Sequence, residues 1–404
     1  MPTFEEARKI ILDNVVPLGV EKVEILSAVG RVLAEDVAAP WDMPLWDNTA
    51  MDGYAVHADD CPEDAVLKLE GFLPAGGHMT EKVARGIAVK ILTGAPIPPG
   101  ADAVIPFEEA EEKDGRVFVK KAVKAGDHIR FKGEDVKTGE TVLPSGTVLR
   151  PSEISMLASF GKLFVPVHRK VRVAVLSTGD ELVEPGEALA PGKIINSNSL
   201  ALAAAVKQAG AVPIMLGIAR DNRESLREKL AEGLRADVLI TSAGVSAGDR
   251  DFVRDVLEEL MVNQVFWKVN IKPGRPTAFA LRDGKPVFSL PGNPVSSLLT
   301  FEEFVRPALL KMMGHRRVLR PLVKATLKGS VDKKPGRVNF IRVAVEHEKG
   351  EFVVRSAGRQ ETGFLKTLLL ADGIAIIPAE HDGIKAGDRV DVHLLDGDGG
   401  LVEA

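Results

Sequence analysis

Apolar residues recur at helical spacing close to the N-terminus, where Phe4, Ala7 and Ile11 fall on one face. Thr3 and Glu6 stand three residues apart, the spacing at which each side chain of a capping box accepts a hydrogen bond from the other residue's backbone. The pattern therefore predicts an N-terminal helix that Thr3 caps.

The pattern then changes to short apolar runs separated by turns. A second short helix is predicted around residues 27–33. From residue 40 to residue 146, frequent glycine and proline separate β-branched runs such as 88–92 and 116–119. Such runs are typical of short strands. We therefore expect a β-rich module here, followed by a helix at 151–160.

Strands and helices alternate in the central part of the chain. Strands are predicted at 171–176, 212–217, 238–241 and 287–290, with strand residues also near 266–271, and helices at 199–208, 223–234, 251–260 and 295–313. This alternation predicts a mostly parallel sheet with helices on both faces. After residue 314 the pattern is again that of strands, which predicts a small barrel or sandwich of about 85 residues.

Composition and charge narrow the class of protein. The 404 residues suggest two to four domains, and 45% hydrophobic with 27% charged residues is typical of folded domains. The net charge of −5 argues against binding to nucleic acid or to a membrane surface. The single cysteine, Cys61, excludes an intramolecular disulfide, and no Cys or His cluster offers zinc ligands. We expect a cytoplasmic protein without a secretory signal or membrane span.

Three loops of the central region combine glycine with serine. In a parallel sheet ligands bind beyond the carboxyl ends of the strands, and backbone N–H and hydroxyl groups there suit an anion. One such loop would be weak support, because glycine also serves simply to turn the chain. The Walker A and Gly-x-Gly-x-x-Gly fingerprints are absent, which disfavours a P-loop or a dinucleotide site. The candidate binding residues are Ser177, Thr178 and Gly179, then Ser242, Gly244 and Ser246, then Pro291, Gly292, Asn293, Pro294 and Ser296.

Cationic residues follow in one short segment. Lys268, Asn270 and Lys272 alternate with apolar residues, so a strand here would place all three on one face. Gly274 and Arg275 come directly after it. Lysines that protect an edge strand would give the same pattern. The neighbouring anion-suited loops favour a cationic binding segment.

Acidic residues stand in the same loops and in the β-rich module. Carboxylates suit Mg²⁺, which takes one or two of them together with substrate oxygens and water. For any single aspartate in a loop, a helix cap or a turn is the better explanation. The candidates are Asp52, Asp135, Asp180, Glu181, Asp221, Asp249 and Asp251.

The chain's only tyrosine, Tyr54, fits a hydrophobic anchor whose hydroxyl group has a partner. Its segment is also the first of several motifs, at 47–56, 92–96, 100–104, 130–135, 177–182, 244–246, 272–274 and 291–294. Together these motifs resemble those of the molybdopterin molybdenumtransferase family, called MoeA in bacteria and archaea and the E domain in gephyrin. The resemblance spans essentially the whole chain. Ala243 replaces a usual glycine, and we expect it to stiffen its loop and narrow access to the ligand.

The resemblance implies the fold class α/β plus β and an elongated homodimer of four-domain subunits. The central α/β domain, of molybdopterin-binding type, would span 169–317. The other domains would be a small N-terminal domain at 1–45 with 135–168, a β-rich inserted domain at 46–134 and a C-terminal barrel-like β domain at 318–404. In the dimer, the α/β domain of one subunit would face the β-rich domain of the other.

The resemblance also implies the reaction, in which molybdate enters adenylylated molybdopterin with Mg²⁺-assisted release of AMP to give molybdenum cofactor. Glu181 and Asp251 would support the metal. The C-terminal domain would add Arg337 or Arg342 for the oxyanion, and the sequence does not choose between them. The implied catalytic residues are Asp52, Thr93, Asp135, Glu181, Asp221, Asp251, Lys268 and Lys272.

Some alternatives stay open at this stage. Molybdate and tungstate are similar tetrahedral dianions, so the physiological oxyanion is undecided. A molybdopterin adenylyltransferase would use a similar α/β domain, and a transient contact with that enzyme is expected. A non-enzymatic scaffold is the third possibility. The extra β domains and the Lys272–Gly274 motif favour insertion, and the lack of an attached G domain in this sequence disfavours a scaffold.

Overall fold

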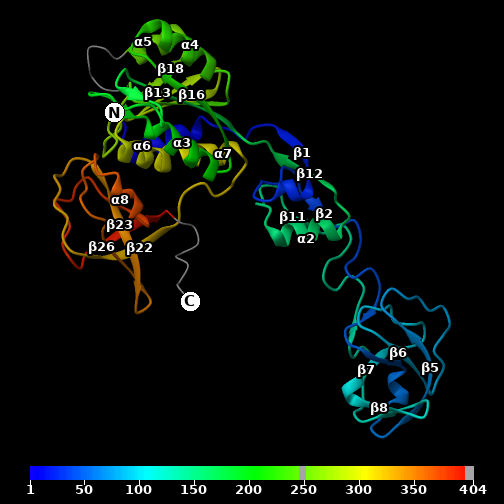
Figure 1. Ribbon diagram of the computed structural model, residues 1–404. Helices are drawn as coiled ribbons and strands as arrows, with labels where there is room; N and C mark the ends of the chain where they lie inside the picture. The colour runs from blue at the N-terminus through cyan, green and yellow to red at the C-terminus, as the bar shows by residue number, and fades with distance from the viewer. Residues whose placement is uncertain (245–251, 396–404) are drawn as a thin grey trace. The chain divides into compact units, whose positions relative to one another are not determined.

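The computed structural model describes residues 1–244 and 252–395, and the chain forms two compact units (Figure 1). Unit 1 comprises Met1–Ala34, Gly146–Arg150 and Phe164–Ala404, and unit 2 comprises Glu35–Ser145 and Pro151–Leu163. The boundaries of the four expected domains stay a prediction. Within the described ranges, we find no helix with the length and apolar character needed to cross a bilayer.

A six-stranded sheet forms the centre of unit 1, in the order β16-β13-β17-β21-β20-β18. Its strands are β13 (Arg172–Thr178), β16 (Val212–Ala219), β17 (Val238–Ser242), β18 (Asn263–Phe266), β20 (Ala278–Arg282) and β21 (Lys285–Leu290). β20, which lies between β21 and β18, runs in the direction opposite to the other five strands of this sheet. The predicted mostly parallel sheet is confirmed, although the sequence pattern did not reveal β20.

Helices cover both faces of this sheet (Figure 1). One face carries α3 (Ser197–Gln208), α6 (Pro294–Thr300) and α7 (Arg306–Met312), and the other carries α4 (Arg223–Gly233) and α5 (Phe252–Glu259). Strand alternation explains the two cores, because Val173 and Val175 pack on the first face while Ala174 and Leu176 pack on the second. A π-helical segment, Phe301–Val305, joins α6 to α7.

The N-terminal helix α1 (Phe4–Asp13) has the predicted capping box: Thr3 Oγ1 accepts from Glu6 N at 3.2 Å and the Glu6 carboxylate accepts from Thr3 N at 2.9 Å. The helix predicted at 27–33 is wrong. A single 3₁₀ turn, Ile25–Ala28, is followed by backbone that pairs with distant residues, since Leu33 N donates to Thr147 O at 2.9 Å. Long-range pairing has overridden the local preference there.

The C-terminal part of unit 1 is a closed barrel. Its strands are β22 (Leu322–Lys328), β23 (Val338–Glu348), β24 (Glu351–Ser356), β25 (Gly373–Ile377) and β26 (Arg389–Leu394). The ring closes because β23 pairs with both β24 and β25. The structure therefore selects the barrel from the two architectures that the sequence left open.

The cationic segment is not the single strand that we predicted. β18 ends at Phe266 in the α/β sheet, the chain bends, and β19 (Ile271–Lys272) pairs in parallel with Val338 and Asn339 of the barrel. The segment changes direction because it passes from one sheet to another. Burial still alternates, since Val269 and Ile271 are fully buried.

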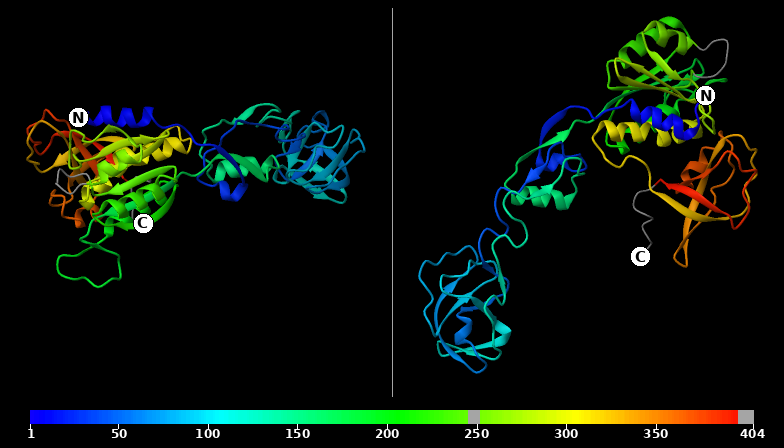
Figure 2. Two further views of the ribbon diagram at one scale, coloured as in Figure 1. Left: turned by 90° about the horizontal axis from the view of Figure 1, so that it is seen from above. Right: turned by 180° about the vertical axis from the view of Figure 1, so that it is seen from behind.

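Unit 2, drawn mainly in blue and cyan in Figure 2, is built around another six-stranded sheet, in the order β7-β4-β6-β5-β9-β8. Its strands are β4 (Gly53–Val56), β5 (Val66–Leu73), β6 (Ile87–Ile91), β7 (Ala103–Pro106), β8 (Ala110–Lys113) and β9 (Arg116–Val119). The same unit contains β3 (Asn48–Thr49), β10 (Ile129–Arg130) and the predicted helix, α2 (Pro151–Ser159). The expected β-rich module is confirmed.

Tyr54 is a buried anchor of this sheet, as predicted. Its hydroxyl donates to Glu112 Oε2 at 2.9 Å, and Lys90 Nζ donates to the same oxygen at 2.8 Å. Its ring packs edge-on against Phe107. Burial and then the Glu112 carboxylate raise the pKa of Tyr54 to about 12. Tyr54 is therefore a neutral donor at physiological pH.

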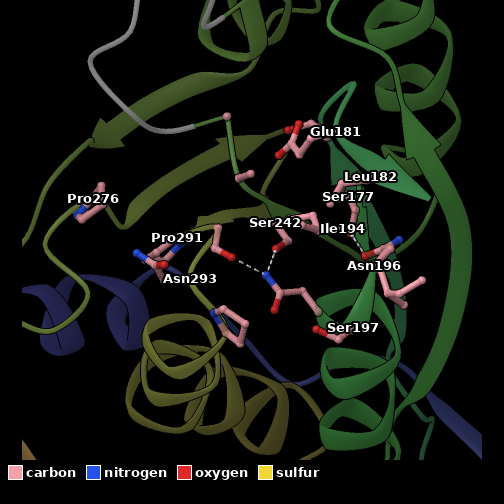
Figure 3. Close-up of a pocket in the computed structure, with 17 residues that line it drawn as sticks. Ser177, Glu181, Leu182, Ile194, Asn196, Ser197, Ser242, Pro276, Pro291 and Asn293 are labelled. Atoms are coloured by element: carbon pink, nitrogen blue, oxygen red, sulfur yellow. Dashed lines mark hydrogen bonds between the residues drawn. The ribbon is translucent and has the colours of Figure 1, made fainter. Parts of the chain in front are cut away.

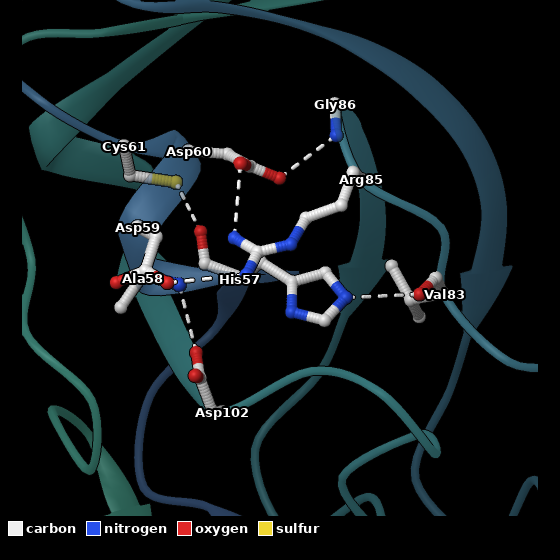
Figure 4. A network of polar contacts seen from close by, with 9 residues as sticks. All are labelled: His57, Ala58, Asp59, Asp60, Cys61, Val83, Arg85, Gly86 and Asp102. Atoms are coloured by element: carbon white, nitrogen blue, oxygen red, sulfur yellow. Dashed lines mark hydrogen bonds and ion pairs between the residues drawn. The ribbon is translucent and has the colours of Figure 1, made fainter.

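A polar network fixes the chain beyond β4 (Figure 4). The Asp60 carboxylate accepts from Gly86 N at 2.9 Å and from Arg85 at 3.1 Å, which ties this turn to the start of β6. Cys61 lies beneath it, 1% exposed, and its thiol donates to His57 O. Burial, followed by the nearby Asp60 and Asp102 charges, raises the pKa of the Cys61 thiol to about 12. This cysteine is therefore structural.

Candidate functional site

A cavity of about 450 Å³ opens at the carboxyl ends of β13 and β17 (Figure 3). We call it the sheet-edge cavity. The chain leaves β13 toward α3 on one face and β17 toward α5 on the other, which makes this the switch point where open α/β sheets bind ligands. All three predicted loops contribute to it: the candidates that line it are Ser177, Thr178, Glu181, Ser242, Gly244, Pro291, Gly292, Asn293 and Pro294.

Two asparagines that sequence reasoning missed organise this cavity. Asn198 Nδ2 donates to Ser242 Oγ at 2.9 Å and to Gly292 O at 2.7 Å, so one side chain joins two of the loops. Asn196 caps α3 and its Oδ1 accepts from Ser177 Oγ at 2.9 Å. For Asn196 the available signal was the polar run Asn-Ser-Asn-Ser before a helical pattern, since asparagine is a preferred cap.

Ala243 also lines the cavity, in a backbone conformation that favours glycine. Its φ is +74°, as is that of Gly244. A Cβ atom placed on Gly292 would lie 3.2 Å from the Ala243 methyl carbon, so two loops approach each other closely at this point. The methyl group occupies space that a glycine would leave to the ligand.

The carboxylates near the cavity have different surroundings. Glu181 lines it, and its carboxylate folds over the Cα atom of Gly179. Asp221 does not line it. Instead, Asp180 and Asp221 each accept a 3.2 Å hydrogen bond from the other's backbone N–H, which joins the loops after β13 and β16. The predicted residues Ser246, Asp249 and Asp251 lie outside the described residues.

Metal-ligating side chains do not cluster in the described ranges. Across 1–244 and 252–395, we find no group of three or more His, Cys, Asp or Glu side chains placed to hold a metal. Glu181 offers one carboxylate at the sheet-edge cavity. One carboxylate together with substrate phosphates is an arrangement that Mg²⁺ accepts.

A second cavity, of about 530 Å³, lies where β19 meets the barrel. We call it the barrel cavity. Lys272 and Pro273 line it from one side, and Lys333, Arg359 and other barrel residues line it from the other. Lys333 Nζ donates to Pro378 O at 2.7 Å, and burial lowers its pKa. Three cationic residues thus line one space, together with the acidic residues Asp332 and Glu361, and the sequence indicated only Lys272 among them.

The segment from Lys272 to Pro276 joins the two cavities. Lys272 lines the barrel cavity and Pro276 lines the sheet-edge cavity. Gly274 lies between them with φ +102°, and a Cβ atom there would lie 2.5 Å from Thr300 Cγ2 of α6. Only glycine fits this contact. The half-buried Lys268 and the exposed Arg275 line neither cavity.

The two candidate arginines differ in exposure. Arg337 is half-buried and lies directly before β23. Arg342, in the middle of that strand, is 0% exposed and its guanidinium contacts other groups of the barrel. Ser296 is also buried, 3% exposed, inside α6 and away from the sheet-edge lining.

In unit 2 the predicted residues Asp52 and Thr93 lie together. Asp52 Oδ1 accepts from Thr93 N and from Thr93 Oγ1, both at 2.7 Å. The backbone hydrogen bond and then the hydroxyl lower the pKa of Asp52. Asp135 is exposed, and its backbone N–H donates to Met43 O at 3.0 Å.

Family sequence models match most of the chain. The MoeA N-terminal region (domain I and II) matches residues 2–161, a probable molybdopterin-binding domain matches 174–311, and the MoeA C-terminal region (domain IV) matches 324–395. The three matched regions follow one another along the chain without overlap.

Curated proteins and solved structures agree with these matches. The molybdopterin molybdenumtransferase of Haemophilus influenzae is 36% identical over 98% of this chain and 100% of that protein. Molybdopterin molybdenumtransferase 2 of Mycobacterium tuberculosis is 36% identical over 97% of this chain and 99% of its own length. The crystal structure of the molybdopterin biosynthesis MoeA protein from Pyrococcus horikoshii is 34% identical, with a TM-score of 0.84 over 98% of this chain and 99% of that one.

Proposed function

Because the chain belongs to the MoeA family of molybdopterin molybdenumtransferases, we propose that it inserts molybdenum into molybdopterin during synthesis of the molybdenum cofactor. The observation that carries this proposal is the Lys272–Pro276 segment, which borders one cavity suited to a phosphorylated ligand and another suited to a small oxyanion. An enzyme that joins two anionic substrates needs such adjacent sites.

The sheet-edge cavity is the proposed site of adenylylated molybdopterin. Backbone N–H groups of the glycine-containing loops and the hydroxyl groups of Ser177, Thr178 and Ser242 can donate to a pyrophosphate. Asn198 holds two of these loops together before the ligand arrives. Such preorganisation reduces the cost of ordering the loops on binding.

The barrel cavity is the proposed site of the oxyanion, molybdate or the similar tungstate. Lys272, Lys333 and Arg359 supply positive charge, and Thr362 adds a hydroxyl donor. Arg337 does not line this cavity, but it is half-buried and its carbonyl accepts from Lys333 Nζ at 3.3 Å, so it is the better of the two predicted arginines for direct contact. Arg342 is fully buried and its guanidinium is engaged elsewhere.

We also propose that Mg²⁺ takes part, held by Glu181 and by Asp251, the latter outside the described residues. When bound, the ion would neutralise charge on the phosphate groups. The protein's own contribution is positional and electrostatic: Lys272 would stabilise the charge that AMP carries away, and the loop N–H groups would hold the phosphates in place. Lys268, which lines neither cavity, would act on this charge only from a distance.

The family resemblance further supports a homodimer in which Asp52, Thr93 and Asp135 act from the second subunit. Asp221 would act indirectly, because its carboxylate is bonded to the loop that carries Asp180 and Glu181.

Incubation of the purified protein with adenylylated molybdopterin and molybdate tests the proposal. We expect molybdate-dependent AMP release and a product that activates a cofactor-free molybdenum enzyme. Lys272→Gln should reduce the rate strongly, whereas Lys324→Gln should not, because Lys324 is an exposed barrel lysine paired with Asp391 at 3.2 Å. Formation of stable adenylylated molybdopterin from molybdopterin and ATP would instead favour an adenylyltransferase.

A further inference from the structure

Arg342 is the largest fully buried side chain of the described residues, at 0% exposed in the middle of β23. Burial lowers the pKa of its guanidinium. One of its nitrogens, Nη1, is buried without a hydrogen-bond partner. A buried charge with an unpaired donor is expensive, and apolar residues often replace such groups without loss of stability. Packing alone therefore does not explain an arginine at this position.

The side-chain hydrogen bonds of Arg342 all go to one loop and to the helix that follows it. Nη2 donates to Arg359 O at 3.1 Å and to Glu361 O at 3.4 Å. The backbone of Arg342 exchanges hydrogen bonds with the Gln360 amide, at 3.0 and 3.1 Å. Nε donates to Thr367 Oγ1 at 2.8 Å. Arg342 thus fixes the loop 359–361 through its carbonyl groups.

This loop is one wall of the barrel cavity. Arg359, Gln360, Glu361 and Thr362 all line the cavity, whereas Arg342 does not. Carbonyl oxygens that accept from a guanidinium behind the wall are directed toward that guanidinium. The partial negative charges of these carbonyl oxygens then do not face an oxyanion in the cavity. The side chains of Arg359 and Thr362 can face the oxyanion instead.

We propose that Arg342 is a positioning residue for the oxyanion, because it holds the carbonyl groups of Arg359 and Glu361 toward the barrel interior. These carbonyl oxygens then add no further negative potential to the barrel cavity, whose lining contains the acidic residues Asp332 and Glu361 besides Lys272, Lys333 and Arg359. This inference rests on the proposed function, because it assumes that the barrel cavity takes molybdate. Arg342 acts through the loop and makes no contact with the anion.

The test compares Arg342→Met and Arg342→Lys with the matched control Arg320→Met. The Arg320 guanidinium is also largely buried but bonds to Glu302 rather than to the loop. Molybdate binding is measured by calorimetry on the full chain, together with hydrogen exchange of the 359–362 amides without ligand. For Arg342→Met we expect the dissociation constant to rise about 10- to 100-fold, the range seen when supporting hydrogen bonds at ligand sites are lost. Arg342→Lys should recover part of this loss. The control Arg320→Met should bind molybdate with wild-type affinity.

Loop exchange should rise in Arg342→Met while exchange in β22 and β26 stays at the wild-type rate. Wild-type molybdate affinity in Arg342→Met, or weaker binding with unchanged loop exchange, would overturn the inference. If Arg342→Met does not fold, Arg342→Lys decides the question. Wild-type molybdate affinity together with wild-type exchange of the 359–362 amides in Arg342→Lys would contradict a role that depends on the two carbonyl contacts. A wild-type protein that binds no molybdate would overturn the proposed function and this inference with it. If the wild-type protein binds molybdate, the results for the Arg342 variants test this inference alone.

Discussion

Asp52 and Asp42 lie in nearly identical local arrangements within unit 2. Asp42 Oδ1 accepts from Thr138 N and Thr138 Oγ1 at 2.8 Å, as Asp52 Oδ1 accepts from Thr93 at 2.7 Å. In both cases the backbone hydrogen bond is the main reason that the pKa of the carboxyl is lowered. The arrangement is that of a loop clamp, so a catalytic role for Asp52 must depend on its free carboxylate oxygen.

This similarity supplies a matched pair of variants. We expect Asp52→Asn to reduce molybdenum insertion at least about 100-fold, a typical loss for a catalytic acid–base group, and Asp42→Asn to change it less than about twofold. Asparagine keeps an acceptor oxygen in both variants, so their urea denaturation midpoints should shift by similar small amounts, with slightly more for Asp42, which also pairs with Lys132 at 3.5 Å. Equal activities would mean that Asp52 only clamps its loop.

At the scale of elements, the anchor of β17 shows how charge supports the central sheet. Arg169 donates to both oxygens of Asp237, at 2.7 and 2.8 Å, and Arg172 N donates at 2.8 Å. Burial alone would raise the pKa of Asp237, but these donors outweigh it and lower the pKa. The ion pair joins the start of β13 to the start of β17.

The pKa of Asp237 is lower in the folded state than in the unfolded state, where it is near 4. The contribution of Asp237 to the free energy of unfolding is therefore fully present above pH 4 and is lost as the pH falls through the folded-state pKa. We expect Asp237→Asn to lower the free energy of unfolding of unit 1 by about 1–2 kcal/mol at pH 7, a modest value because Arg169 is partly exposed. The difference from wild type should shrink as pH falls below about 4. Urea denaturation followed by Trp267 fluorescence, with Trp41 and Trp46 replaced by Phe, measures it. Asp283→Asn, at an exposed turn, is the control and should show no such pH dependence.

The elements that the sequence predicted correctly are those set by local pattern. Alternating residues such as Val173 and Ala174 assign each strand face, and the spacing in α1 follows from 3.6 residues per turn. The predictions that were wrong concern residues with partners far away in the sequence. Leu33 donates a backbone hydrogen bond to Thr147, and Lys272 pairs with Asn339 of the barrel. Periodicity within a short window carries no information about such partners.

The candidate site follows the same rule. The three glycine–serine loops could be expected together, because parallel strands end at one edge of a sheet. Asn198 could not, since its two bonds join loops far apart in the sequence. The cations of the barrel cavity were equally hidden, because Lys333 and Arg359 meet Lys272 only when β19 joins the barrel.

At the scale of the whole molecule, unit 2 has hydrophobic cores of its own. Two clusters, one around Tyr54 and Ile105 and one around Leu73 and Val104, contain residues only between 46 and 134. A segment with its own core can in principle fold alone. We expect the fragment 46–134 to unfold cooperatively on heating and to keep Cys61 protected from thiol reagents at pH 8. A fragment that reacts at once would contradict both the fragment's independence and the expected domain boundary.

The proposed dimer makes a separate prediction. If Asp52 of one subunit serves Lys272 of the other, Asp52→Asn and Lys272→Gln should each be inactive alone but active when coexpressed. A mixed dimer then has one intact and one doubly altered site, and with half of all dimers mixed we expect about one quarter of wild-type activity. Purification through two different tags measures the mixed dimer directly. A mixed dimer as inactive as its parents would place both residues of each site on the same subunit.

The membership of β19 in the barrel has a consequence for how such chains can be recombined. The barrel is not formed by one contiguous stretch of chain. Ile271 and Lys272 pair with Val338 and Asn339, although the α/β elements β20, β21, α6 and α7 come between them in the sequence. A chimaera with its junction near residue 318 would set one relative's β19 against another relative's β23. Exchange of oxyanion preference between relatives would therefore require the short segment around Lys272 to be transferred together with the barrel.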